Sequence, residues 1–188
     1  MVEFLRYPQI VPVLNEHGIV EAGDDARRTF TLTSPDAACV HFRATPGPDD
    51  PAGSIRVPLQ RLTSIPEEVL LRLHVGDVAL IPVGTWRSIL DAAAFALAKD
   101  EKWLTVDAEA SMHQNSRDPL AVTPKSRHII GVLLGGLIES GADGADHELH
   151  LLSLTSPLVL RLSPGGRIDV WCPTAAIAER VASVVNAA

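Results

Sequence analysis

The sequence has only two cysteines, Cys39 and Cys172, and they are far apart. Such a pair makes neither a disulfide scaffold nor a zinc motif, because both need several cysteines at short spacings. Cys172 comes just before the last expected helix, whose N-terminus would favour a thiolate. One hypothesis is therefore a reactive thiol at Cys172. The favoured interpretation of both cysteines is a small buried strand residue, since no cysteine motif accompanies them.

Positive charge is also scarce. The chain has 16 Lys and Arg against 23 Asp and Glu, which gives a net charge of −7. Binding to nucleic acid needs clustered basic residues, so we expect no nucleic-acid partner. Few lysines and many alanines are typical of a bacterial protein from a GC-rich genome.

Long apolar runs are missing as well. A membrane helix needs about 18 to 20 apolar residues, and no run approaches that length. The N-terminal segment carries Glu3, Arg6 and Pro8, which do not fit a signal peptide. We therefore expect no membrane association and a cytoplasmic location. Hydrophobic residues make up 46% and charged residues 21%, which predicts one compact domain over 1–188.

Several short strands and four longer helices are predicted. The helices begin at Ser64, Thr85, Thr123 and Thr174, where residues suited to capping precede apolar residues at helical spacing. The turn SPGG at 163–166 predicts a hairpin between the last two strands. The strands are expected at 10–14, 18–22, 29–33, 38–42, 54–59, 77–83, 103–110, 150–154, 158–162 and 167–171.

Strands that cluster along the sequence predict an α+β fold. We expect a mostly antiparallel sheet with about four helices packed on it. Segments 77–97 and 167–185 each read as a strand, a turn, a threonine cap and an amphipathic helix. One hypothesis is therefore that this domain consists of two structurally related halves, 1–102 and 103–188.

The apolar segment HIIGVLLGGLIESG at 128–141 contains glycines inside an expected helix. No lysine follows in the position that a phosphate loop needs, and the spacing does not fit a dinucleotide fingerprint. We therefore predict no cofactor. Gly131 and Gly135 lie four residues apart on one helix face, which predicts close packing of another backbone there.

A metal site is one hypothesis for the acidic segment before the strand at 150–154. If 146–150 is extended, the side chains of Asp146, Glu148 and His150 share one face and present typical metal ligands. The favoured alternative is a solvated sheet edge, because metal sites normally draw ligands from several elements.

The polar segment 113–118 is a second candidate site. Arg117 can hold an anion, His113 can exchange protons near neutrality, and Asn115 adds hydrogen-bonding capacity, so a ligand site is one hypothesis. The alternative is a solvated loop in which Asp118 pairs with Arg117.

These patterns contain no convergent catalytic set. The sequence therefore favours a non-enzymatic module that binds a protein partner or associates with itself as a homodimer. The alternative is a small-molecule enzyme that uses segment 113–118 with Cys172, or with a metal held by the ligand set at 146–150.

Overall fold

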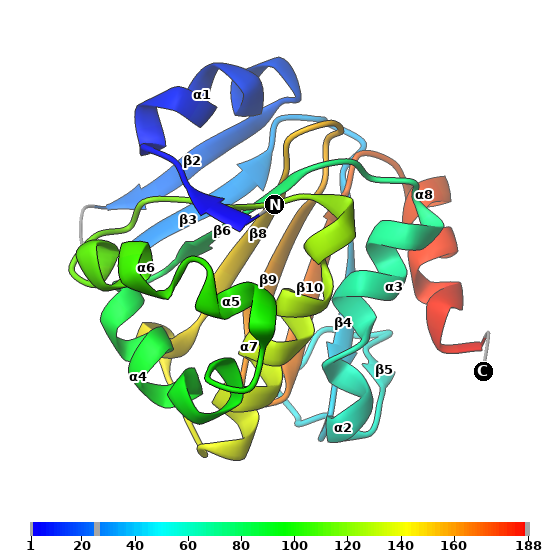
Figure 1. The fold of residues 1–188 in the computed structure, drawn as a ribbon. Helices are drawn as coiled ribbons and strands as arrows, with labels where there is room; N and C mark the ends of the chain where they lie inside the picture. The colour runs from blue at the N-terminus through cyan, green and yellow to red at the C-terminus, as the bar shows by residue number, and fades with distance from the viewer. Residues whose placement is uncertain (1, 25–26, 187–188) are drawn as a thin grey trace.

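One large sheet organises the computed structural model, which describes residues 2–24 and 27–186 (Figure 1). All neighbours in this sheet are antiparallel except the last pair, so the predicted, mostly antiparallel sheet is confirmed. Its eight strands within the described residues are, in spatial order, β1 (Val2–Phe4), β7 (Leu120–Val122), β6 (Val78–Pro82), β8 (Leu149–Ser153), β9 (Val159–Ser163), β10 (Arg167–Cys172), β4 (Ala38–Arg43) and β5 (Ile55–Arg56).

Two further strands, β2 (Ile19–Asp24) and β3 (Arg27–Leu32), form a separate hairpin. The described residues contain eight α-helices rather than about four, because several short helices occupy segments expected to be loops or strands. None of the helices in these ranges is long and apolar enough to cross a bilayer. The helices are α1 (Tyr7–Glu16), α2 (Leu59–Leu62), α3 (Ile65–Arg72), α4 (Trp86–Leu97), α5 (Glu101–Leu104), α6 (Asp107–His113), α7 (His128–Glu139) and α8 (Ala175–Ala182).

The predicted strand at 10–14 is wrong, because α1 spans this segment. Pro8 stands in the first turn, where a proline is tolerated, and the backbone N–H of Arg6 donates to the side chain of Gln9. Ile10 and Leu14 are the buried residues of the helix, and their spacing of four is helical. The β-branched residues of this short segment therefore led to a strand prediction, although the segment forms an amphipathic helix.

The predicted strand at 103–110 is also wrong, because α5 and α6 occupy it. Asp100 caps α5 by accepting hydrogen bonds from the backbone N–H groups of Lys102 and Trp103. Trp103, Val106 and Ala110 are buried at helical spacing. The burial of this helical stripe outweighs the alternation of apolar and polar residues in the same segment.

The large sheet has two differently covered faces. The first face carries the main core and packs against α3, α4, α7 and α8. The second face carries a smaller core, formed with α1 and the β2–β3 hairpin, which lie together at the top of Figure 1. Along β4, the buried side chains of Val40 and Phe42 belong to the core of the first face. The alternating Cys39, His41 and Arg43 therefore point to the second face.

The strands of the two expected halves interleave in the sheet. β7 comes from the second half and lies between β1 and β6 of the first. The units β6–α4 and β10–α8 both form, with Thr85 and Thr174 at the helix N-caps. A structural relation between the halves stays a prediction.

The glycines of α7 differ in how closely atoms of neighbouring elements approach them. A Cβ on Gly131 would lie 3.2 Å from the backbone oxygen of Thr63, and one on Gly135 would lie 3.8 Å from the Thr63 methyl group. The tightest approach is at Gly136, where a Cβ would lie 3.0 Å from the Cα of Ala93 in α4. Gly136 is therefore the glycine that the α4–α7 contact needs most.

We expect Gly136→Ala to lower the free energy of unfolding by roughly 1 to 3 kcal/mol, because α4 must move away from the new methyl group. Gly135→Ala is the matched control, since its methyl group makes an ordinary contact and alanine favours a helix by up to about 1 kcal/mol. Urea unfolding of both variants measures the difference. Equal stability of the two variants would contradict the packing role of Gly136.

Candidate functional site

The register between β4 and β10 brings two polar side chains together. His41 stands directly across from Asp169. Because the N–H of Ala44 donates to the carbonyl of Gly166, the hydrogen-bonded pairs of this ladder involve Phe42, Val40 and Ala38. His41 and Asp169 therefore form a non-hydrogen-bonded pair, in which side chains lie closest.

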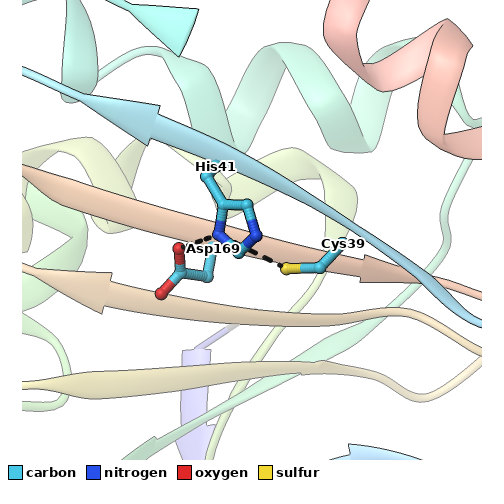
Figure 2. Close-up of side chains that lie close together, drawn as sticks. All are labelled: Cys39, His41 and Asp169. Atoms are coloured by element: carbon cyan, nitrogen blue, oxygen red, sulfur yellow. Dashed lines mark hydrogen bonds and ion pairs between the residues drawn. The ribbon is translucent and has the colours of Figure 1, made fainter. Parts of the chain in front are cut away.

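Cys39, His41 and Asp169 form a compact group on the second face, which we call the Cys39 cluster (Figure 2). The His41 Nδ1 atom lies 2.8 Å from Asp169 Oδ1 and 3.8 Å from the Cys39 sulfur. All three potential ligand atoms lie within 4.8 Å of one another, and each residue is partly buried. The cluster thus offers sulfur, nitrogen and oxygen donors at one point.

A buried arginine fixes the carboxylate of the cluster. Arg43 is only 4% exposed, and its guanidinium contacts Asp169 Oδ1 at 2.7 Å and Asp50 Oδ1 at 2.6 Å. Burial alone would lower the pKa of Arg43, but the hydrogen bonds to Asp50 and Asp169 raise it overall. A hydrogen bond from the backbone of Gly47, together with Arg43, lowers the pKa of Asp50. Arg43 therefore stays charged and holds Asp169 in place.

The Cys39 cluster does not have the geometry of a nucleophilic triad. In such a triad the histidine contacts the nucleophile with one ring nitrogen and the carboxylate with the other. Here Nδ1 of His41 faces both Cys39 and Asp169. Burial and the charge of Asp169 also raise the pKa of the Cys39 thiol to about 12, which opposes formation of a free thiolate.

The side chains of the predicted ligand set at 146–150 do not converge on one point, in contrast to those of the Cys39 cluster. Asp146 lies in the 3-10 turn Ala145–His147 rather than in an extended segment. The carboxylate of Glu148 binds the guanidinium of Arg161 and accepts a hydrogen bond from Ser163. His150 is 1% exposed and meets Phe30 edge-on beneath the β2–β3 hairpin. The carboxylate of Glu148 is thus already bound, and the imidazole of His150 is enclosed.

The predicted ligand residues of segment 113–118 are used in local contacts. His113 stacks on Phe4 and contacts Asp118 at 3.1 Å. Asn115 accepts a hydrogen bond from Arg87. Arg117 donates to the backbone oxygen of Gly84. These contacts tie the segment to the start of α4 and to β1.

Cys172 lies on the first face of the sheet and is completely buried in the main core. Burial raises the pKa of its thiol to about 12. His113 packs on β1, five strand positions from β10, which corresponds to about 24 Å. The structure therefore does not bring Cys172 and segment 113–118 together.

The Cys39 cluster was not predicted from the sequence, although one signal for it was present. In the alternating segment ACVHF, Cys39 and His41 are two residues apart and must share one face of a strand. A thiol and an imidazole on one face are a metal-ligand pattern. The third member, Asp169, is 128 positions from His41, and only the pairing register reveals it.

No known protein family, curated protein or solved structure matches this chain.

His150 makes the stability of the protein depend on pH. Burial and the neighbouring Arg161 lower the pKa of His150 from 6.5 to about 4, and Glu148 opposes this shift only in part. Between pH 6.5 and pH 4, His150 is therefore protonated in the unfolded chain but neutral in the folded chain. The free energy of unfolding should fall by as much as about 3 kcal/mol as pH drops from 6.5 to 4.

Urea unfolding at pH 7 and pH 4.5 measures this loss. We expect His150→Leu to lose much less stability between the two pH values than the wild type. The control variant His74→Asn changes an exposed histidine with positive φ, a conformation that asparagine tolerates, and should keep the wild-type pH dependence. An unchanged pH dependence in His150→Leu would rule out His150 as the source.

Proposed function

We propose that the protein is a non-enzymatic binding protein that takes a divalent transition-metal ion such as Zn²⁺ at the Cys39 cluster. The observation that carries this proposal is the approach of three different ligand atoms, from two neighbouring strands, to within 4.8 Å of one another. Zinc accepts cysteine sulfur, histidine nitrogen and carboxylate oxygen together.

The two distances from His41 in the cluster lie within about half an ångström of those around such an ion. With zinc bonds of about 2.0 Å to nitrogen or oxygen and about 2.3 Å to sulfur, tetrahedral ligand atoms lie roughly 3.3 to 3.5 Å apart. The distances from His41 Nδ1 are 3.8 Å to the Cys39 sulfur and 2.8 Å to Asp169 Oδ1. Shifts of about half an ångström in the side chains are enough to admit the ion.

The charges around the cluster also favour a dication. With the ion bound, Cys39 is a thiolate, and Asp169 and Asp50 are carboxylates. Arg43 contributes one positive charge through its contacts with both carboxylates. These four groups sum to −2, which a divalent ion neutralises. Arg43 also orients the carboxylate of Asp169, as outer hydrogen-bond partners do in metal sites.

Three protein ligands leave one coordination position for water or another donor. The side chains of His41 and Asp169 are 21% and 19% exposed, so solvent reaches the cluster. An ion therefore has a route to the site from solvent. A route of this kind supports reversible binding rather than a closed structural site.

We expect protein stripped with a chelator and then dialysed against excess Zn²⁺ to retain one ion per chain, measured by elemental analysis. Cys39→Ser and Asp169→Asn should each reduce zinc affinity by at least tenfold in a competition assay with a chelating dye, because each removes a charged ligand. With Co²⁺, the wild type should show the absorption band of a thiolate–cobalt bond.

Cys172→Ala is the matched control, since it removes the only other thiol and leaves the Cys39 cluster intact. Glu148→Gln tests the ligand set at 146–150 in the same assay. Zinc that is lost in Glu148→Gln but kept in Cys39→Ser would move the metal to that set and contradict our proposal. Absence of zinc from the wild type would do the same.

Zinc affinity should rise with pH. The Cys39 thiol has a pKa of about 12 and must lose its proton to bind the ion. One released proton corresponds to an increase of about tenfold in affinity per pH unit. Isothermal titration with Zn²⁺ at pH 7 and pH 8, in two buffers of different ionisation enthalpy, measures both the affinity and the proton release. Affinity that is independent of pH would exclude the Cys39 thiol as a ligand.

A further inference from the structure

A surface hollow lies among α4, α5 and α6, in the layer of helices that covers the first face (Figure 1). Contacts at both ends of α4 hold the other two helices beside it. The N–H of Arg87, at the start of α4, donates to the carbonyl of Gln114, which follows α6. Asp100, which follows α4, caps the N-terminus of α5. Between these two points the three helices surround a space of about 210 Å³, which we call the α4–α6 hollow.

The floor of the α4–α6 hollow is apolar. Ala94 and Ala98 of α4 line it with small side chains, which leave space above the floor. Leu104 also lines the hollow and is 57% exposed. An apolar group that enters the hollow therefore covers apolar protein surface, which is the main favourable contribution to binding. The floor consists of four residues of the main core that are at most 8% exposed: Leu90, Leu97, Trp103 and Ala110.

The rim of the α4–α6 hollow carries negative charge. Asp91 of α4 and Asp107 of α6 both line the hollow and are exposed. Among the described residues, neither carboxylate forms an ion pair, and no lysine, arginine or histidine lines the hollow. The indole N–H of Trp103 donates to Asp107 Oδ1 at 3.3 Å, which holds this carboxylate at the edge of the floor. A cationic ligand would therefore meet two carboxylates that no cationic side chain of the hollow neutralises.

From this combination we infer that the α4–α6 hollow binds a small organic ammonium ion. The apolar chain of the ligand lies on the floor, and its charge lies at the rim near Asp91 and Asp107. Ligand sites typically combine a mostly apolar lining with a few polar groups that fix the orientation of the ligand. The hollow is smaller than the roughly 300 to 1,000 Å³ of pockets for drug-sized molecules, so the ligand is a short amine.

Charge distinguishes an amine from other small apolar ligands at this site. A neutral alcohol of the same length gains only the apolar contact, and a carboxylate is repelled by both aspartates. The α4–α6 hollow also lies on the first-face side of the sheet, whereas the Cys39 cluster lies on the second face. Binding of an amine is therefore independent of the proposed metal site.

Amide NMR titrations of the full chain at pH 7 and low salt test the inference with three probes of equal chain length: n-hexylammonium, n-hexanol and n-hexanoate. We expect n-hexylammonium to cause saturable shifts of amides in α4, α5 and α6. Its affinity should exceed that of n-hexanol by roughly fivefold or more, because each exposed carboxylate adds a modest attraction. n-Hexanoate should bind more weakly than n-hexanol. High salt should remove most of the preference for the amine.

Variants of the rim test the role of charge. The double variant Asp91→Asn, Asp107→Asn preserves the size of both side chains and should bind n-hexylammonium no more tightly than n-hexanol. Glu109→Gln is the matched control, since Glu109 is a carboxylate of α6 that does not line the hollow, and it should keep the wild-type preference.

Variants that fill space test the location. Ala94→Phe should abolish binding of both n-hexylammonium and n-hexanol, because its ring occupies the hollow. Ala108→Phe, at an exposed position of α6 outside the hollow, should leave binding unchanged. Absence of saturable shifts, equal affinity of the wild type for the amine and the alcohol, a preference that survives the double variant, or binding that survives Ala94→Phe would each overturn the inference.

Discussion

The register between β4 and β10 is the constraint on which the site depends. A strand places alternate side chains on opposite faces, so a slip of one residue would exchange the two sets. In the observed register Val40 and Phe42 enter the main core, and His41 meets Asp169. The burial of apolar residues on the first face thus fixes the polar contacts on the second face.

The second face therefore consists of an apolar row and a polar row of side chains, each running across several strands. Leu152, Val159 and Trp171 belong to or pack against the smaller core that the β2–β3 hairpin and α1 cover. In the next row, His150, Arg161, Asp169 and His41 follow one another across four strands. The charged members of this row need partners because buried charges are costly when unpaired: Glu148 pairs with Arg161, and Arg43 pairs with Asp169. The Cys39 cluster lies at the end of this row, where no further strand covers it in the described part of the chain.

Sequence patterns correctly predicted the elements in which turn and capping residues and the spacing of apolar residues all indicate the same structure. The last three strands, the hairpin at SPGG and the helices that follow Thr85 and Thr174 are all present. The errors at α1 and at α5–α6 arose in short segments, where helical and strand periods are hard to tell apart. β1 and β7 have three residues each, which is too short for a sequence pattern to identify a strand. The partnership of His41 with Asp169 depends on strand pairing across most of the chain, which no local pattern encodes.

The long separation between β4 and β10 also determines when the site can exist. β4 is synthesised before β10, and Asp169 follows His41 by 128 positions in the chain. Contacts between such distant segments form late because closing a long loop costs entropy. Until then Cys39 and His41 belong to a strand without its main neighbour. A growing chain therefore cannot assemble the Cys39 cluster before Asp169 has been synthesised, and any ion must bind after that point.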